Sequence, residues 1–322
     1  MKVKILWIVL IATVLGIRFN TVGYGQEKYP SKPIQIVVPF GAGGSSDLFF
    51  RSLTDELSKM MKVPVTVVDR TGASGLVGAD FVANSKNDGY TLLGTSSAPI
   101  TIAPAIDPKD ARELDPLALL AYQANLIATR NESEFRTLDD LVEYAKKKPG
   151  ALTCGTSGIQ SEPYFALELF KAAAKIDLRH VPISSSREGI TNTLGGHIDF
   201  WFGSLSTSQS LMKAGRIRGL AVCTERRLES FPSIPTFAEK NYPQVNVNLI
   251  ITLLGPRGLP QAVIKTWEDV LKAVLANPEV AASSKRLNYD IDLQVGTEKL
   301  RAYFKGEVER FSKIAKQTGL RK

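Results

Sequence analysis

The sequence contains few of the side chains from which metal centres and covalent scaffolds are built. Among its 322 residues there are only two Cys and two His. Two cysteines cannot hold a chain of this length together as a disulfide scaffold, and the shortage leaves little material for a zinc, haem or iron–sulfur site. We therefore expect no metal and no cofactor. Cys154 and Cys223 are expected to be buried free thiols, with a disulfide between them as the alternative.

Long hydrophobic runs are also missing, except for one at the beginning of the chain. Lys2 and Lys4 precede an uncharged run over 5–17, which is too short to cross a hydrocarbon core of about 30 Å. Small residues lie just ahead of Gln26, where a signal peptidase needs them. This pattern predicts a signal peptide over 1–25 and export of the mature protein, with an uncleaved anchor as the alternative.

The surplus of positive charge is small and scattered. The chain has 40 Lys+Arg and 32 Asp+Glu, a net charge of +8. Residues 1–25 hold three basic and no acidic side chains, so the mature protein would carry +5. No basic stripe with interleaved aromatic residues and no known binding motif occurs, which argues against a nucleic-acid partner.

Apolar runs typical of strands alternate with helical patterns, which predicts an α/β fold with mostly parallel sheets. Strands are expected at 34–38, 65–68, 90–93, 126–129, 152–154, 178–181, 198–202, 220–223 and 245–254. Helices are expected at 48–61, 72–85, 137–148, 162–175, 187–194, 260–276, 278–286 and 297–317. An irregular stretch ending near residue 121 separates two successive β/α sets, so we expect two lobes with a ligand cleft between them.

The strongest functional signal is the loop between the first strand and the first helix. It reads Pro39-Phe40-Gly41-Ala42-Gly43-Gly44-Ser45-Ser46-Asp47. Its glycines let the backbone approach a ligand closely, and a serine or Asp47 can cap the helix. The first N–H groups of that helix stay free for an anion. The loop therefore predicts a site for a carboxylate or phosphate, with a tight turn that binds nothing as the alternative.

Nucleotide and hydrolase chemistry fit the sequence less well. The loop lacks the Gly-Lys-Ser/Thr of a P-loop, and Ser46 occupies the place of the third glycine in a dinucleotide fingerprint. No Gly-x-Ser-x-Gly occurs anywhere in the chain, so the nucleophile elbow of a serine hydrolase is missing. An exported hydrolase of unknown substrate stays open as an alternative.

A series of short motifs runs in order through nearly the whole mature chain. They are Tyr29-Pro30-Ser31-Lys32-Pro33-Ile34, Val38-Pro39-Phe40-Gly41 to Gly44 with Asp47, Arg70-Thr71-Gly72-Ala73-Ser74-Gly75 with Gly78-Ala79, Asp88-Gly89-Tyr90-Thr91-Leu92-Leu93, Thr156-Ser157-Gly158, His180-Val181-Pro182, Leu194-Gly195-Gly196 with Asp199, and Ile234-Pro235-Thr236. As an ordered set they resemble the Bug family, the periplasmic solute receptors of tripartite tricarboxylate transporters.

The resemblance implies a type II periplasmic binding protein fold and no enzymatic activity. It places the first lobe at 26–124 plus 245–322 and the second at 125–244, with hinges where the chain crosses between them. It implies a periplasmic monomer that captures a dicarboxylate, a tricarboxylate or an aromatic acid for the membrane subunits of a transporter. A sensor that presents its solute to a signalling partner is the alternative.

In this family two βα loops, one from each lobe, hold the carboxylate groups of the ligand through N–H groups, hydroxyls and water. The resemblance thus implies a set of ligand-binding residues in and around two loops, of which Ser161 can also cap the helix that follows the second loop. They are Phe40, Gly41, Ala42, Gly43, Gly44, Ser45, Ser46 and Asp47 in the first loop, Thr156, Ser157, Gly158 and Ser161 in the second, and Ser96, Ile183, Ser184 and Gly203 elsewhere.

Departures from the family pattern bear on specificity. The chain reads Ile183-Ser184-Ser185 where the family usually has Tyr-Lys-Gly, and Arg187 stands where the family has a small residue. Gly203 replaces an Asp that can recognise amino groups, which argues against an amino-acid ligand. With Phe40 and Trp201-Phe202 nearby, we expect an apolar or aromatic carboxylate, although Trp201 in the sheet core is the alternative.

Overall fold

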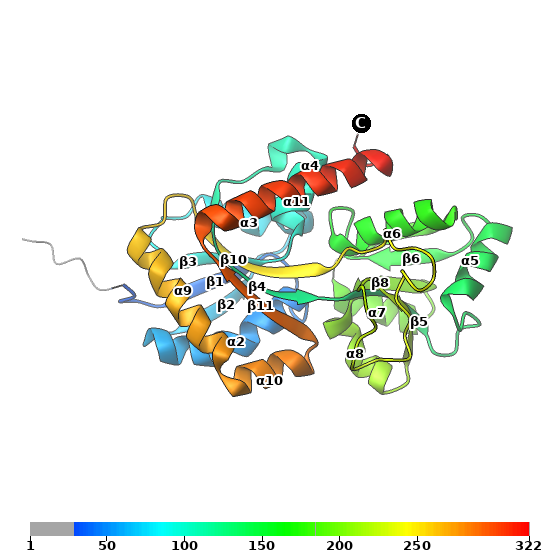
Figure 1. The fold of residues 1–322 in the computed structure, drawn as a ribbon, viewed down its shortest axis with the longest axis horizontal. Helices are drawn as coiled ribbons and strands as arrows, with labels where there is room; N and C mark the ends of the chain where they lie inside the picture. Colours follow the sequence, from blue (N-terminus) through cyan, green and yellow to red (C-terminus); the bar gives the residue numbers. More distant parts are fainter. Residues whose placement is uncertain (1–28, 184, 322) are drawn as a thin grey trace, which may run out of the picture.

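The chain folds into two lobes, each built around its own β-sheet (Figure 1). A computed structural model describes residues 29–183 and 185–321. The expected signal peptide and Ser184 lie outside the described residues. Among the helices described, none combines the length and the apolar character that crossing a membrane requires.

The larger lobe carries a six-stranded sheet in the order β11-β4-β10-β3-β1-β2. Its strands are β1 (Ile34–Val38), β2 (Val65–Asp69), β3 (Thr91–Thr95), β4 (Leu114–Gln123), β10 (Leu249–Pro256) and β11 (Tyr289–Val295). One face packs on α2 (Ser45–Met61), α9 (Gln261–Ala276) and α10 (Pro278–Arg286). The other packs on α3 (Leu76–Ala83) and the first half of α11 (Thr297–Gln317). Short helices η1 (Ala73–Gly75), η2 (Ala98–Ile102), α4 (Ala103–Ile106) and η3 (Pro108–Asp110) fill the connections.

The smaller lobe carries a five-stranded sheet in the order β7-β6-β8-β5-β9. Its strands are β5 (Asn125–Arg130), β6 (Thr153–Thr156), β7 (Arg179–Pro182), β8 (Phe200–Ser204) and β9 (Ile217–Val222). Helices α5 (Leu138–Lys147) and α6 (Glu162–Ala174) cover one face, and α7 (Ser186–Leu194) and α8 (Leu205–Lys213) cover the other. Cys154 and Cys223 lie buried in this lobe as free thiols, which confirms the expectation.

The predicted two-lobed α/β fold is confirmed, but the prediction of mostly parallel sheets is wrong. Four strand pairings are parallel and five are antiparallel. The pattern also predicts no strand at β4 or β11 and no helix at α8. Pro116 interrupts β4, charged residues alternate along β11, and serines dilute the apolar periodicity of α8.

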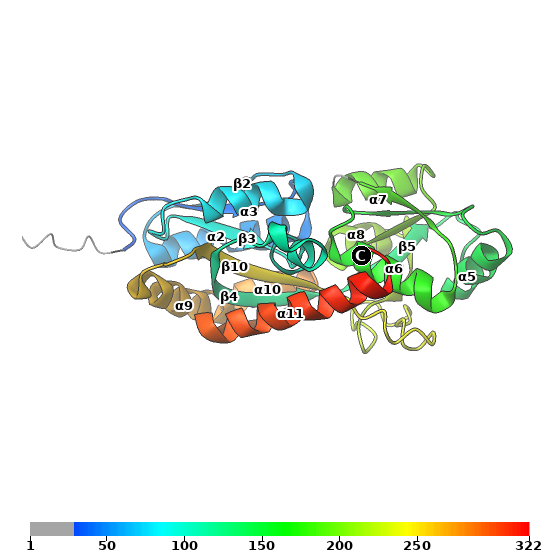
Figure 2. The same cartoon turned by 90° about the horizontal axis from the view of Figure 1, so that it is seen from above.

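Helix α11 links the two lobes through apolar packing. Leu300 and Phe304 in its first half contact the larger sheet, whereas Phe311 and Ile314 in its second half belong to the core of the smaller lobe. The ring of Phe311 meets Phe165 of α6 edge-on, with 5.4 Å between ring centroids. Both views show α11 running from one lobe to the other (Figures 1 and 2). The core of the smaller lobe is therefore completed by the C-terminal helix.

Trp201 of β8 fills a slot that two glycines leave open. Its side chain is fully buried in the smaller lobe. A Cβ atom at Gly189 of α7 would lie 2.2 Å from the indole ring, and one at Gly203 would lie 2.2 Å from Nε1. Phe202 points into the core on the opposite face of the sheet. The expectation that these two rings wall the ligand is therefore wrong, and Trp201 is a core residue.

Replacing Gly189 with Ala is expected to lower the free energy of unfolding by about 1–3 kcal/mol, because the added methyl group overlaps Trp201. Chemical denaturation measures the loss. In a Trp201→Leu background the same substitution should cost clearly less, since the indole ring is gone. An equal cost in both backgrounds would contradict the packing explanation.

Candidate ligand-binding site

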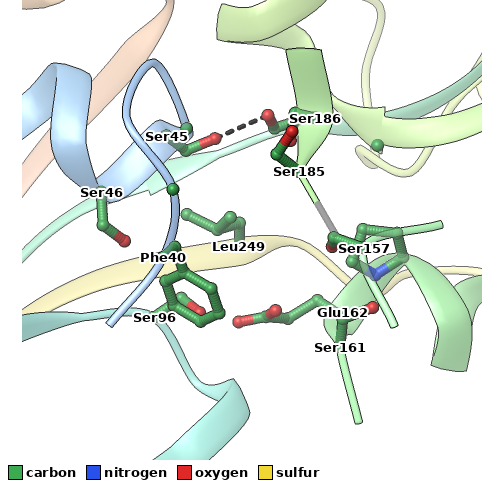
Figure 3. A pocket seen from close by; sticks show the side chains of 15 residues that line it. Phe40, Ser45, Ser46, Ser96, Ser157, Ser161, Glu162, Ser185, Ser186 and Leu249 are labelled. Atoms are coloured by element: carbon green, nitrogen blue, oxygen red, sulfur yellow. Dashed lines mark hydrogen bonds between the residues drawn. The ribbon is translucent and has the colours of Figure 1, made fainter. Parts of the chain in front are cut away.

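A pocket lies between the two lobes, where loops and helix starts from both meet (Figure 3). The space between its walls, including space open to solvent, is about 580 Å³. The larger lobe lines it with Phe40, Gly41, Gly44, Ser45, Ser46, Ser96 and Leu249. The smaller lobe lines it with Ser157, Ser161, Glu162, Pro163, Ser185, Ser186, Gly203 and Ser204.

Four α-helices begin at the wall of this pocket. Helix α2 begins at Ser45, α6 at Glu162, α7 at Ser186, and α8 at Leu205 after Ser204. The first N–H groups of a helix lack acceptors within the helix, and the helix end carries a partial positive charge. Four such ends around one pocket favour an anion there.

The side chains of the pocket contribute hydroxyl groups and almost no charge. Eight of the lining residues are serines, and Glu162 is the only ionisable one among the described residues that line it. Nowhere within 29–183 or 185–321 do three or more His, Cys, Asp or Glu gather to hold a metal ion. A bound anion would therefore meet N–H and hydroxyl donors and no lysine or arginine of the described lining.

Asp47 stabilises the first loop from within. Its Oδ2 accepts the N–H of Gly43 at 2.7 Å, and its Oδ1 pairs with Arg51 one turn further along α2. The N–H of Gly44 donates to the carbonyl of Gly41 at 3.0 Å, which closes the turn. Gly43 adopts a φ of +78°, a conformation that favours glycine. The loop is therefore held in shape by its own hydrogen bonds, with the Asp47 carboxylate directed away from the pocket.

Hydrogen bonds join the lobes on both sides of the pocket. Ser45 Oγ donates to Ser204 Oγ at 2.6 Å, and the N–H of Ser97 donates to Glu162 Oε1 at 2.8 Å. Burial raises the pKa of Glu162, while hydrogen bonds from its own N–H and from Ser96 and Ser97 act in the opposite direction. Both lobes thus contribute polar groups that meet across the cleft.

A buried polar network supports the start of α2. The hydroxyl of Tyr289 donates to the carbonyl of Ser45 at 2.6 Å, and Ser206 Oγ donates to Gln123 Oε1 at 2.8 Å. Ser45 Oγ lies 3.3 Å from Ser206 Oγ. Burial raises the pKa of Tyr289, so its phenol keeps the proton that it donates. The network positions Ser45 from β11, from the end of β4 and from α8.

The second loop is held by its own polar contacts. Ser161 caps α6 as predicted, since its Oγ accepts the N–H of Tyr164 at 3.4 Å. Thr156 Oγ1 bonds His180 Nε2 at 2.8 Å, so Thr156 is engaged by β7. Burial, and then the charge of Lys171, lower the pKa of His180 to about 4. A neutral imidazole therefore supports the loop at neutral pH.

The pocket brings together a little over half of the predicted site residues. Those that line it are Phe40, Gly41, Gly44, Ser45, Ser46, Ser96, Ser157, Ser161 and Gly203. Gly158 and Ile183 line an adjoining depression. Four others line neither space: Ala42, which is exposed to solvent, Gly43, Asp47 and Thr156.

Six lining residues were not predicted from the sequence. They are Glu162, Pro163, Ser185, Ser186, Ser204 and Leu249. All but Leu249 lie where a strand or loop passes into α6, α7 or α8. The signal that identified the first loop, a strand followed by a small polar residue and a helix, also applies to them.

Known proteins share both the sequence pattern and the fold. A sequence profile described as tripartite tricarboxylate transporter family receptor matches residues 49–320. Protein BugT of Bordetella pertussis is 27% identical over 317 residues, covering 95% of this chain and 96% of BugT. The structure of periplasmic binding protein BugD is similar with a TM-score of 0.85 at 25% identity, covering 91% of this chain and 99% of that one. R. palustris Rpa4515 with adipate is similar with a TM-score of 0.85 at 25% identity, covering 90% and 98%.

Proposed function

The chain belongs to the tripartite tricarboxylate transporter receptor family and is a solute-binding receptor, not an enzyme; we propose that it holds one small carboxylate between its lobes. The observation that carries the proposal is the convergence of four helix starts and eight serines on one pocket. Charge-assisted hydrogen bonds from N–H and hydroxyl groups suit a carboxylate. The similar protein Rpa4515 was solved with adipate, a small carboxylate, which supports the same class of ligand here.

We propose that capture proceeds by closure of the lobes. We propose lobe boundaries at 26–124 plus 245–322 for one lobe and at 125–244 for the other. In support, the larger sheet takes its strands from 34–123 and 249–295, and the smaller takes its strands from 125–222. The chain crosses at Ala124 and again before β10, and these crossings serve as hinges, while Phe311 and Ile314 keep the second half of α11 in the core of the smaller lobe.

We further propose that the protein works in the periplasm as a monomer and passes its solute to the membrane subunits of a transporter. The basic and apolar pattern of residues 1–25 supports export through a cleaved signal peptide. Family membership supports the partner. Under this proposal the net charge of the exported protein falls to +5, a mild surplus that attracts acids.

A thermal-shift screen over aliphatic monocarboxylates, dicarboxylates, tricarboxylates and aromatic acids tests the proposal. At least one acid should raise the melting temperature in a saturable manner, because a ligand that binds only the folded state stabilises it. The matching carboxylate esters should give no shift and no turnover. If no acid stabilises the protein, the proposed function is wrong, and turnover of an ester would favour the hydrolase alternative.

Ser157→Ala is expected to weaken binding of the acid found in this screen by about 1 kcal/mol, roughly fivefold, because the variant removes a hydroxyl donor from the pocket. Isothermal titration calorimetry measures the change. Ser52→Ala is the matched control, since Ser52 Oγ bonds the Phe49 carbonyl within α2 and does not line the pocket. An unchanged dissociation constant for Ser157→Ala would remove this residue from the site.

Gly43→Val is expected to abolish binding while the fold survives. A Cβ atom at Gly43 would lie 2.8 Å from Arg187 Nη2, which reaches the first loop from α7, and the positive φ strains any side chain. Gly215→Val is the control, because Gly215 has a φ of +66° with nothing within 4 Å of its added Cβ. Circular dichroism checks the fold of both. Equal affinity of the two variants would show that the first loop is not part of the site.

A further inference from the structure

Glu162 is a buried acid in a pocket that otherwise suits an anion. It is the first residue of α6 and is 2% exposed, between the cap Ser161 and Pro163. Figure 3 shows it among the side chains that line the pocket. No other lining residue of the described chain carries an ionisable side chain.

The Glu162 carboxylate already uses donors that a ligand would otherwise take. Its Oε1 accepts the N–H of Ser97 at 2.8 Å, across the cleft from its own lobe. Its own N–H and the hydroxyls of Ser96 and Ser97 are further donors beside it. The start of α6 is therefore occupied by an acid of the protein itself, which leaves the starts of α2, α7 and α8 for a ligand.

Burial raises the pKa of Glu162, while the N–H and hydroxyl donors around its carboxylate and the start of α6 favour its ionised form. A second anionic group in the same pocket would meet the negative charge of that ionised form. Like charges a few ångströms apart repel strongly where water is largely excluded. The described lining offers no lysine or arginine to neutralise the pair. Arg51 is already paired with Asp47, and Arg187 lies against Gly43, which does not line the pocket. Phe40, Pro163 and Leu249 supply the apolar part of the pocket wall. The pocket therefore matches one ligand carboxylate plus an uncharged remainder.

We propose that Glu162, ionised in the pocket, is a specificity-determining residue that makes the receptor select monocarboxylates over dicarboxylates. The single carboxylate of the ligand is held at the starts of α2, α7 and α8. The uncharged end lies toward Glu162, where a second carboxylate would be repelled. This inference rests on the proposed function, since it requires that a carboxylate enters the pocket.

Calorimetry with acids matched in chain length tests the inference. The pairs are hexanoate with adipate, octanoate with suberate, and benzoate with terephthalate. The wild-type protein should bind the monoacid of its preferred pair about tenfold or more tightly than the diacid. Glu162→Gln keeps the shape and removes the charge, and should shift this ratio toward the diacid by about tenfold.

Controls separate a charge effect from damage to the fold. Glu168→Gln changes a glutamate on the same helix that pairs with Lys171 outside the pocket, and should leave the ratio unchanged. Should Glu162→Gln fail to fold by circular dichroism, Glu162→Ser takes its place, because serine is tolerated at a helix start.

Each outcome decides between the claims. A wild-type preference for the diacid, or a ratio that Glu162→Gln leaves unchanged, would overturn the selection of monocarboxylates while the carboxylate receptor stands. If no acid of any pair or of the wider screen binds the wild-type protein, the proposed function itself fails, before any variant is compared.

Discussion

The packing of α11 into the smaller lobe is the constraint on which the arrangement of the molecule depends. The smaller lobe buries Phe311 and Ile314 in the same core as Phe165, while Leu300 keeps the helix on the larger sheet. Burial of apolar side chains is the main source of folding stability, so neither lobe is complete without this helix. The shared helix sets the two sheets side by side (Figures 1 and 2). The loops that begin α2 and α6 consequently line one cavity.

Charge in the pocket comes from the backbone more than from side chains. The loop acid Asp47 is neutralised by Arg51 and bonded to Gly43, so it stabilises the turn instead of repelling an incoming anion. Helix starts then supply a positive field that does not titrate. Glu162 is the exception, a buried acid held by donors from both lobes. Binding at such a site depends on the exact positions of the helix starts. A displaced backbone N–H group no longer points at the ligand, whereas a flexible lysine side chain could follow it.

Local sequence patterns predict the glycine-rich loop, the Ser161 cap and the strand–helix alternation, because each depends on neighbours along the chain. They do not predict that the sheets are mixed. Strands β10 and β11 run antiparallel to their neighbours because of the side from which the chain re-enters the larger lobe, and a local pattern does not show that side. Ser186 and Ser204 reach the pocket only because the order of strands in the smaller sheet brings α7 and α8 to it. Glu162 directly follows a predicted cap, yet its inward orientation depends on Ser97 in the other lobe.

The hydrogen bonds between the lobes also affect how easily the cleft opens and closes. Ser45 with Ser204, and Ser97 with Glu162, exchange partners with water whenever the cleft widens. Each exchange changes the free energy by only about 1 kcal/mol, so under the proposed closure of the lobes these bonds favour the narrowed form over the widened one only slightly. A solute that contacts both lobes then shifts the balance toward the narrowed form.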